Sequence, residues 1–210
     1  MITELPPHPA SAEPPPFAGP DHPMRQLTRA VAFDDTWTPT NVERVTEVFD
    51  SMAASWTEEH VDPVKAAVVR DAIDRGGPAV GGRWLELGSG TGAGTRILAQ
   101  LGVDQVSVDL SPQMLAHAPE GLAPKVLADS STLPFADDVA DAVLLINMLL
   151  FPAEVDRVLR DDGAVVWVNT LGDQTPIHLP PADVAAALPG NWVGTASRAG
   201  TGIWAVLRRA

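Results

Sequence analysis

The feature that most constrains the fold is a glycine-rich segment, residues 83–95, with the sequence RWLELGSGTGAGT. An apolar, strand-like run leads into glycines at alternate positions (Gly88, Gly90 and Gly92), and a helical pattern over residues 96–101 follows at once. Glycine is needed where the backbone turns with positive φ or where a ligand lies against bare main chain. The helix that begins there presents unpaired N–H groups and the positive end of its dipole to the turn. The segment therefore predicts half of a nucleotide-type binding site.

Charge and composition restrict the partners that this chain can have. Its 210 residues favour one domain with a sizeable core. The formal net charge of −13 argues against a nucleic-acid backbone or an anionic membrane as the main partner. The absence of cysteine excludes disulfides, thiolate metal sites and thiol nucleophiles, and no metal site is expected. The apolar run 142–151 is too short to span a bilayer and no signal peptide is visible, so we expect a cytoplasmic protein.

The order of patterns along the chain predicts an α/β fold. Residues 1–23 are rich in proline and are expected to form a disordered arm, with one domain over residues 24–210. Two helices are expected before the first strand, one from about Thr40 and one from about Asp62 to Arg75. Strands are then expected at residues 83–87, 105–109, 125–129, 139–147 and 163–169, and the runs 192–198 and 202–208 suggest a closing antiparallel hairpin. This alternation predicts a doubly wound, mostly parallel sheet with ligands at the carboxyl ends of its strands.

Acidic residues lie near the carboxyl ends of three of these strands and decide which ligand the glycine turn favours. Glu86 places a carboxylate at the mouth of the turn, where it would repel a pyrophosphate and attract a cationic amine or sulfonium. Asp109 and Asp129 end the next two strands. Read loosely, Gly88-x-Gly90-x-x-Ala93 also fits the dinucleotide fingerprint, with Asp109 at a suitable distance for a ribose. Three acids around one pocket favour a ligand with a positive charge and many hydrogen-bond donors.

Several motifs in sequence carry a resemblance to a known family. They are LELGSGTG at residues 85–92, VDLSPQML at residues 108–115, Ala128-Asp129 followed by Leu133-Pro134-Phe135, and the runs 141–149 and 158–163. In this order and spacing, the chain resembles the class I S-adenosylmethionine-dependent methyltransferases, most closely their small-molecule branch (methyltransferase type 11, ubiquinone-biosynthesis-like). The resemblance covers roughly residues 45–170. It implies a Rossmann-like, seven-stranded sheet preceded by two extra helices.

The resemblance also implies S-adenosyl-L-methionine as cofactor, with S-adenosyl-L-homocysteine as product. The roles it assigns are as follows: Glu86, Gly88, Ser89 and Gly90 hold the methionine amine and carboxylate, Asp109 the ribose, Leu110 and Met114 the adenine ring, Asp129 and Ser130 the adenine amine and its surroundings, and Asn147 lies beside the sulfonium. The chain after the fifth strand is short, and no sizeable insertion is available there for a substrate lid.

Several of these candidate site residues, and two aromatic residues of an early helix, also have a purely structural interpretation. Asp109 and Asp129 can be turn formers, Asn147 can be a hydrogen-bonded core amide, and Phe49 and Trp56 share a helix face that suits core packing, with a lid over the cofactor as the second interpretation. The acceptor pocket is expected between the early helices around Trp37 and Trp56, residues 147–151 and residues 170–178.

One histidine is the candidate catalytic base. His178 is placed on the expected ligand side and would titrate near neutral pH, although a loop histidine is more often simply exposed. The predicted reaction is in-line transfer of a methyl group to an O, N, S or C nucleophile of a small-molecule acceptor. Two alternatives stay open: an NAD-dependent oxidoreductase, and a non-catalytic module that binds the cofactor.

Overall fold

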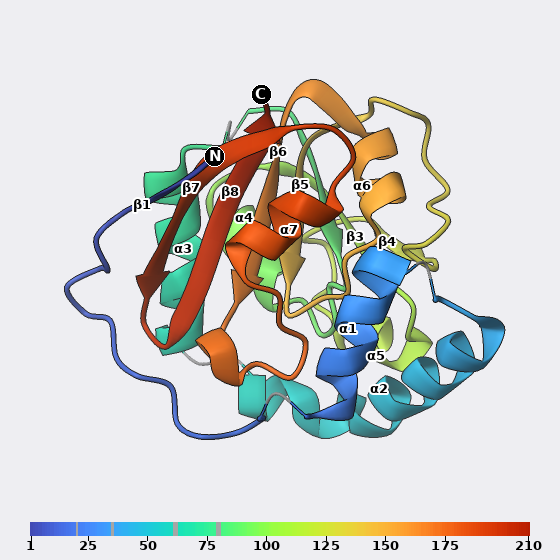
Figure 1. The fold of residues 1–210 in the computed structure, drawn as a ribbon. Coiled ribbons are helices and arrows are strands. Elements are labelled where there is room, and N and C mark those ends of the chain that lie inside the picture. The colour runs from blue at the N-terminus through green and yellow to red at the C-terminus, as the bar shows by residue number, and fades with distance from the viewer. Residues whose placement is uncertain (20, 35, 61–62, 79–80) are drawn as a thin grey trace.

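The chain folds around one eight-stranded sheet flanked by helices (Figure 1). The computed structural model describes residues 1–19, 21–34, 36–60, 63–78 and 81–210, with the backbone alone described at residues 57–60 and 63–65. The strands are β1 (Ile2–Glu4), β2 (Arg83–Leu87), β3 (Asp104–Asp109), β4 (Lys125–Leu127), β5 (Ala140–Ile146), β6 (Leu159–Asn169), β7 (Trp192–Ala199) and β8 (Gly202–Arg209). The helices are α1 (Pro23–Asp34), α2 (Pro39–His60), α3 (Pro63–Gly76), α4 (Ala93–Gln100), α5 (Pro112–His117), α6 (Pro152–Val158), the 3₁₀ turn η1 (Gly172–Gln174) and α7 (Pro181–Ala187).

The sheet topology confirms the predicted doubly wound architecture. The strands lie in the order β1-β7-β8-β6-β5-β2-β3-β4. β8 runs antiparallel to both β6 and β7, and the other neighbouring strands pair in parallel. The central strands β5 and β6 are apolar along most of their length, as expected for parallel strands that are covered on both faces. The antiparallel hairpin at the end of the sheet is therefore also confirmed.

Two expectations for the N-terminal region are wrong. Residues 2–4 form β1, an eighth strand that pairs in parallel with Gly194–Ala196 of β7, so the start of the arm is not disordered. The backbone N–H groups of Leu5 and His8 continue this pairing, each donating to a carbonyl of β7 at 2.8 Å. This segment has few apolar side chains to bury. It is ordered by main-chain hydrogen bonds to the edge of β7, which would otherwise be open. In addition, three helices precede β2 rather than two, because α1 was not predicted.

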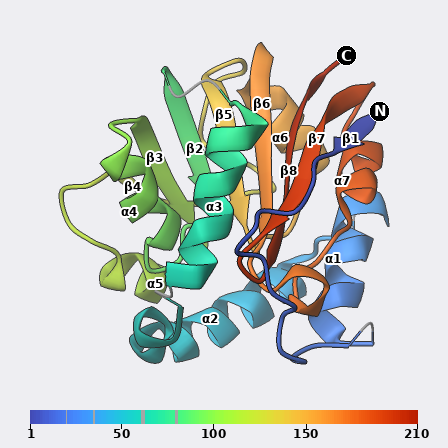
Figure 2. The ribbon, with the colours of Figure 1, turned by 90° about the vertical axis from the view of Figure 1, so that its left-hand side faces the viewer.

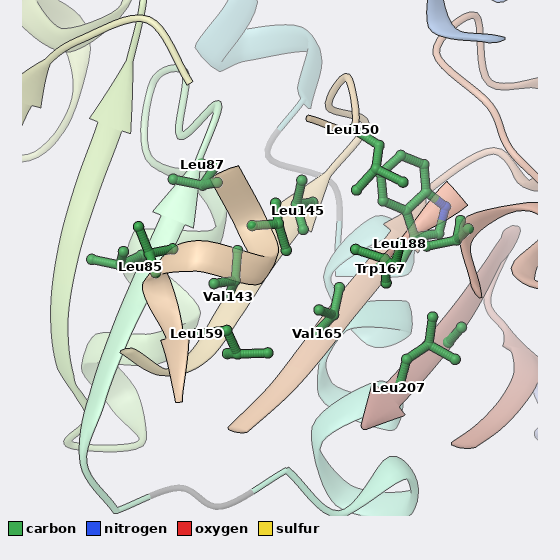
Figure 3. Close-up of a cluster of buried hydrophobic side chains, with 14 of the residues drawn as sticks. Leu85, Leu87, Val143, Leu145, Leu150, Leu159, Val165, Trp167, Leu188 and Leu207 are labelled. Carbon is green, nitrogen blue, oxygen red and sulfur yellow. The ribbon is translucent and has the colours of Figure 1, made fainter. Parts of the chain in front are cut away.

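Side chains of the central strands alternate between two apolar layers. Leu85 and Leu87 of β2 join a cluster on one face of the sheet, where Figure 3 shows them near Val143 and Leu145 of β5. Trp84 points to the opposite face of the sheet and packs there into a second cluster with residues of α3 and α4. Because adjacent residues of a strand point to opposite faces, this alternation fixes the register of β2 between the helix layers. It also directs Glu86 to the same face as Trp84, toward α4.

Helix α2 lies across the carboxyl ends of the parallel strands, as Figure 2 shows at the lower edge of the sheet. Asp50 of α2 accepts hydrogen bonds from the Ser111 hydroxyl and from the backbone N–H of Gln113 at 3.2 Å, which fasten α2 to the start of α5. This helix therefore covers the edge of the sheet at which ligands are expected. Across the described residues, no helix combines the length and the apolar character needed to cross a membrane.

Candidate active site

A cavity of about 310 Å³ opens at the carboxyl ends of the strands. It is lined by all ten residues that the sequence assigns to the cofactor: Glu86, Gly88, Ser89, Gly90, Asp109, Leu110, Met114, Asp129, Ser130 and Asn147. The cavity lies where the chain leaves β2 with β3 on one side and β5 on the other, which is the position where open α/β sheets bind ligands.

The glycine turn after β2 has a backbone that only glycine adopts easily. Gly88, Gly90 and Gly92 have φ values of 67°, 54° and 79°. A Cβ atom added to Gly88 would lie 2.4 Å from the Met148 sulfur, so the side of the turn that faces β5 also has no room for a side chain. Ser89, at the centre of the turn, has a buried hydroxyl with no hydrogen-bond partner in the described part of the chain. The turn thus offers bare main chain to the cavity.

Glu86 is a buried carboxyl group at the inner wall of the cavity. It is only 2% exposed, and its Oε2 atom accepts hydrogen bonds from the Thr95 hydroxyl at 2.5 Å and the Ser107 hydroxyl at 3.5 Å. Burial raises the pKa of Glu86 to about 7, against the lowering effect of the hydrogen bonds from Thr95. The carboxyl is therefore poised between its two protonation states at neutral pH, and a cation bound beside it would favour the charged form.

Asp109 joins the glycine turn to the end of β3. Its Oδ2 atom accepts from the backbone N–H of Gly90 at 2.7 Å, and its Oδ1 atom accepts from the backbone N–H of Ser111 at 2.8 Å. Burial raises the pKa of Asp109, and the backbone hydrogen bonds oppose this effect. Each carboxylate oxygen keeps a lone pair for a ligand, so the side chain can shape the turn and still accept from hydroxyl groups.

Asp129 lies between the cavity and the connection from α1 to α2. Its Oδ1 atom accepts from the backbone N–H of Ser131 at 2.8 Å, and its Oδ2 atom accepts from the indole N–H of Trp37 at 2.9 Å. The Trp37 ring packs edge-to-face on Phe151, with 5.3 Å between ring centroids and an interplanar angle of 71°. Trp37 thus touches both an acid of the predicted cofactor half and an aromatic residue beyond β5.

Asn147 ties the ends of β5 and β6 together. Its Oδ1 atom accepts from the backbone N–H of Thr170 at 2.9 Å, and its Nδ2 atom donates to the Thr170 hydroxyl at 2.8 Å. Asn147 has a φ of 50°, a left-handed conformation that is uncommon for residues other than glycine and that concentrates at functional sites. Both residues line the cavity.

The structure does not bring the candidate base His178 to the cavity. Its neighbour Ile177 lines the cavity, whereas His178 is 8% exposed and its Nδ1 atom is 2.9 Å from Oδ1 of Asn169. Burial, with the nearby charge of Arg25, lowers the pKa of His178 to about 4. The imidazole is therefore neutral at pH 7 and bonded to the core, and the mechanism proposed below does not use it.

Two aromatic residues of α2 form part of the cavity roof. Phe49 and Trp56 both line the cavity, and their rings meet edge-to-face at 5.6 Å. Phe49 also packs on the apolar cluster that contains Phe151, so it borders the cavity and packs on the core at once. Helix α2 thus covers this side of the cavity.

Sequence reasoning missed the lining residues contributed by α1, α3 and α4, and Val45 of α2. They are Met24, Val45, Ala66, Val69, Arg70, Arg96, Ile97 and Gln100. Arg96 has an evident structural task, because its Nη1 atom donates to the carbonyls of Thr91 and Gly92 at 2.8 and 3.0 Å and so braces the glycine turn. The spacing of apolar residues in α1 carried a helical signal, since Met24, Leu27 and Val31 fall on one face.

Comparison with protein families agrees with the geometry of this cavity. Residues 85–167, which run from β2 through most of β6, match the model of a methyltransferase domain. Residues 85–167 of this chain are thus similar to a methyltransferase domain. The motifs that carried the resemblance in the sequence lie mainly within this matched region.

Individual relatives point the same way. The chain is 42% identical to a demethylmenaquinone methyltransferase of Mycobacterium marinum over 93 residues, which cover 41% of this chain and 40% of the relative. It is 39% identical to an uncharacterised methyltransferase of Mycobacterium bovis over 109 residues, which cover 46% of this chain and 44% of the relative. The chain thus spans less than half the length of the curated relatives it matches.

Solved structures share the fold over most of the chain. The complex of DhpI with SAH has a TM-score of 0.64 and 21% identity, with 80% of this chain and 97% of that chain covered. The DhpI-SAM-HEP complex has a TM-score of 0.62 and 23% identity, with 82% of this chain and all of that chain covered. At this level of identity the likeness establishes the common fold.

Proposed function

We propose that this methyltransferase domain binds S-adenosyl-L-methionine and transfers its methyl group to an O, N, S or C nucleophile of a small-molecule acceptor. The observation that carries the proposal is the convergence of Glu86, Asp109 and Asp129, from three neighbouring strand ends, on one cavity beside the glycine turn. Carboxylates in this arrangement suit a ligand with a cationic end and several donor groups.

The residues present fit this cofactor. Gly88 and Gly90 leave main chain open where side chains would fill the cradle, and Ser89 lies between them in the cavity lining. Glu86 would hold the methionine amine, Asp109 the ribose hydroxyls and Asp129 the adenine amine. Leu110 and Met114 would pack against the adenine, with Ser130 beside it and Asn147 near the sulfonium.

The chain contributes mainly alignment and exclusion of water. When bound, S-adenosyl-L-methionine supplies an activated methyl group and a good leaving group, so the protein must hold donor and acceptor in line and keep the site dry. Asn147 and Thr170 fix the ends of β5 and β6 through two hydrogen bonds, and Phe49 and Trp56 close the cavity from α2. A general base is needed only where the acceptor enters protonated.

The names of the relatives support a small-molecule acceptor, because the relative in Mycobacterium marinum is a demethylmenaquinone methyltransferase. The burial of Glu86 weighs against the NAD-dependent alternative, since its carboxyl would meet a pyrophosphate laid on the glycine turn. The absence of His178 from the cavity lining leaves a non-catalytic binding module as the competing proposal.

Calorimetry with S-adenosyl-L-homocysteine, compared with NAD, tests the cofactor. We expect binding of the first and none of the second, and Asp109→Ala should lose most of the affinity. Transfer of a labelled methyl group from S-adenosyl-L-methionine to an acceptor panel separates an enzyme from a binding module. Binding of NAD in place of S-adenosyl-L-homocysteine would overturn the proposal.

A further inference from the structure

We infer that the acceptor is an uncharged, ring-bearing molecule that packs on an apolar surface at one end of the cavity. This surface, the acceptor wall, consists of Trp37, Phe49, Leu149, Phe151 and Ile177, all of which line the cavity. The inference rests on the proposed function, because it assigns to the acceptor the part of the cavity that the bound cofactor would not occupy.

Sheet order separates the acceptor wall from the acidic residues. Glu86 and Asp109 belong to β2 and β3, and Asp129 follows β4, which together form one side of the sheet. Leu149 and Phe151 follow β5, and Ile177 lies between β6 and α7, on the other side of the β2–β5 boundary. Trp37 precedes α2 and Phe49 lies within it. When a ligand is held by the acids, the β5–β6 side of the cavity therefore stays free for a second molecule.

The acceptor wall is a packed apolar surface in its own right. Leu149, Phe151 and Ile177 are 3%, 7% and 7% exposed and form, with Val31 of α1, a cluster distinct from the two layers on the sheet. Trp37 and Phe49 are half-buried and pack on that cluster. Small-molecule sites combine such rigid apolar walls with a few polar groups that set orientation. Asn147 and Thr170, at the ends of β5 and β6, are the polar groups beside this wall.

The distribution of charge excludes a charged acceptor from this wall. Among the described lining residues, the charged side chains are Arg70, Glu86, Arg96, Asp109 and Asp129, and none of them belongs to the wall. Arg70 and Arg96 come from α3 and α4, beside the glycine turn. A charged group placed against the wall would lose its hydration, and the lining carboxylate that touches the wall, Asp129, already accepts from Trp37 and Ser131.

Trp37 gives the wall its preference for a ring. The bond from its indole N–H to Asp129 and the edge-to-face contact with Phe151 fix the plane of the indole. Aromatic rings held in this way favour offset-stacked or edge-to-face partners. Because the same bond ends on Asp129, which we assign to the adenine amine, the orientation of the wall depends on the cofactor half of the site.

Three naphthalene probes of equal ring size test this inference: neutral 1-naphthol, anionic 1-naphthoate and cationic 1-naphthylmethylammonium. Each is titrated calorimetrically into protein saturated with S-adenosyl-L-homocysteine. We expect 1-naphthol to bind at least tenfold more tightly than either charged probe. Equal or tighter binding of a charged probe, or no binding of 1-naphthol, would overturn the inference while binding of S-adenosyl-L-homocysteine upholds the cofactor assignment. Failure of S-adenosyl-L-homocysteine itself to bind would overturn the proposed function and this inference together.

A matched pair of variants locates the probe. Trp37→Phe keeps a ring but removes the bond to Asp129, and it should weaken 1-naphthol binding at least fivefold. Trp192→Phe is the control, because Trp192 likewise donates through its indole, to the carbonyl of Pro189 at 2.7 Å, but it does not line the cavity. Phe49→Ser, on the half-buried face of α2, should weaken binding by a similar factor and provides a second test should Trp37→Phe fail to fold. Unchanged binding in the wall variants, or equal loss in the control, would contradict the assignment.

Discussion

The Oδ2 atom of Asp109 accepts a hydrogen bond from the backbone N–H of Gly90 at 2.7 Å, so the carboxylate at the end of β3 holds the turn at the end of β2. The other oxygen of the same carboxylate holds the start of α5 through Ser111. One side chain thus sets the geometry of both segments against which a ribose would lie. Cofactor binding should therefore depend on Asp109 for shape as well as for direct contact.

Asp109→Asn should weaken binding of S-adenosyl-L-homocysteine at least tenfold, which corresponds to about 1.4 kcal/mol. An amide has one acceptor oxygen in place of two, so either Gly90 or Ser111 loses its partner. Calorimetry at pH 7.5 measures the change. Asp104→Asn is the control, because Asp104 begins the same strand, is exposed and pairs with Arg83 at the opposite end of the sheet. Equal affinity in the two variants would place the ribose elsewhere.

Replacement of Gly94 by alanine should destabilise the fold by about 1–3 kcal/mol, the usual cost of overpacking a buried site. An added Cβ would lie 2.3 Å from Oε1 of Glu86 and 2.7 Å from Cδ1 of Ile146. Urea denaturation measures the free energy of unfolding. Gly81→Ala is a suitable control, since no atom of the residues that the structure describes lies within 4 Å of its added Cβ and its φ is not positive. A Gly94→Ala protein as stable as that control would contradict the packing described for Glu86.

The raised pKa of Glu86, about 7 against an ordinary value of 4.5, predicts a pH-dependent stability of the ligand-free protein. Its contribution is complete below pH 4.5, where the carboxyl is protonated in both folded and unfolded chains. It is lost as the pH rises through about 7, because the unfolded chain ionises first. The loss is on the order of 3 kcal/mol, from 1.36 kcal/mol per unit of pKa.

Glu86→Gln removes this titration, so the free energy of unfolding of the wild type relative to the variant should fall between pH 4.5 and 8. Chemical denaturation at several pH values gives the difference. Binding of S-adenosyl-L-methionine at pH 7 should also release protons from the wild type, because a cation favours ionised Glu86. Calorimetry in buffers of different ionisation enthalpy measures that release, and the same release from Glu86→Gln would show that it comes from another group.

His178 should act in a different pH window and with the opposite sign. Its pKa is lowered to about 4 from an ordinary 6.5, so its contribution to stability is present above pH 6.5 and lost as the pH falls toward 4. His178→Asn should therefore unfold with a weaker pH dependence than the wild type between pH 6.5 and 4. Circular dichroism during acid titration checks this, and a parallel decline in both proteins would assign the acid sensitivity to other groups.

The sequence predicted those parts of the site that rest on local pattern. The acids at the strand ends and the glycine turn could be placed because a parallel sheet brings the carboxyl ends of its strands to one edge. Trp37 and the segment 147–151 were also expected near the acceptor. The bond between Trp37 and Asp129 joins segments 92 residues apart, and no pattern in the sequence specifies such a contact.

The remaining differences have physical causes. β1 is three residues long and lies among prolines, and its order comes from main-chain pairing with β7, which composition does not register. Helix α1 was missed although Met24, Leu27 and Val31 fall on one face, because it begins at Pro23, directly after the proline-rich segment. The environment of His178 was misjudged because a polar loop residue became buried through its bond to Asn169, a tertiary contact.

The short strand β1 affects how readily the protein aggregates in concentrated solution. It pairs with Gly194–Ala196 of the longer strand β7, and at the opposite edge the sheet ends in β4, which also has three residues. Long open rims offer rows of unpaired amides on which a second chain can build a continuous sheet and start an aggregate. Because the edge strands β1 and β4 have only three residues each, they offer few unpaired amides for such growth.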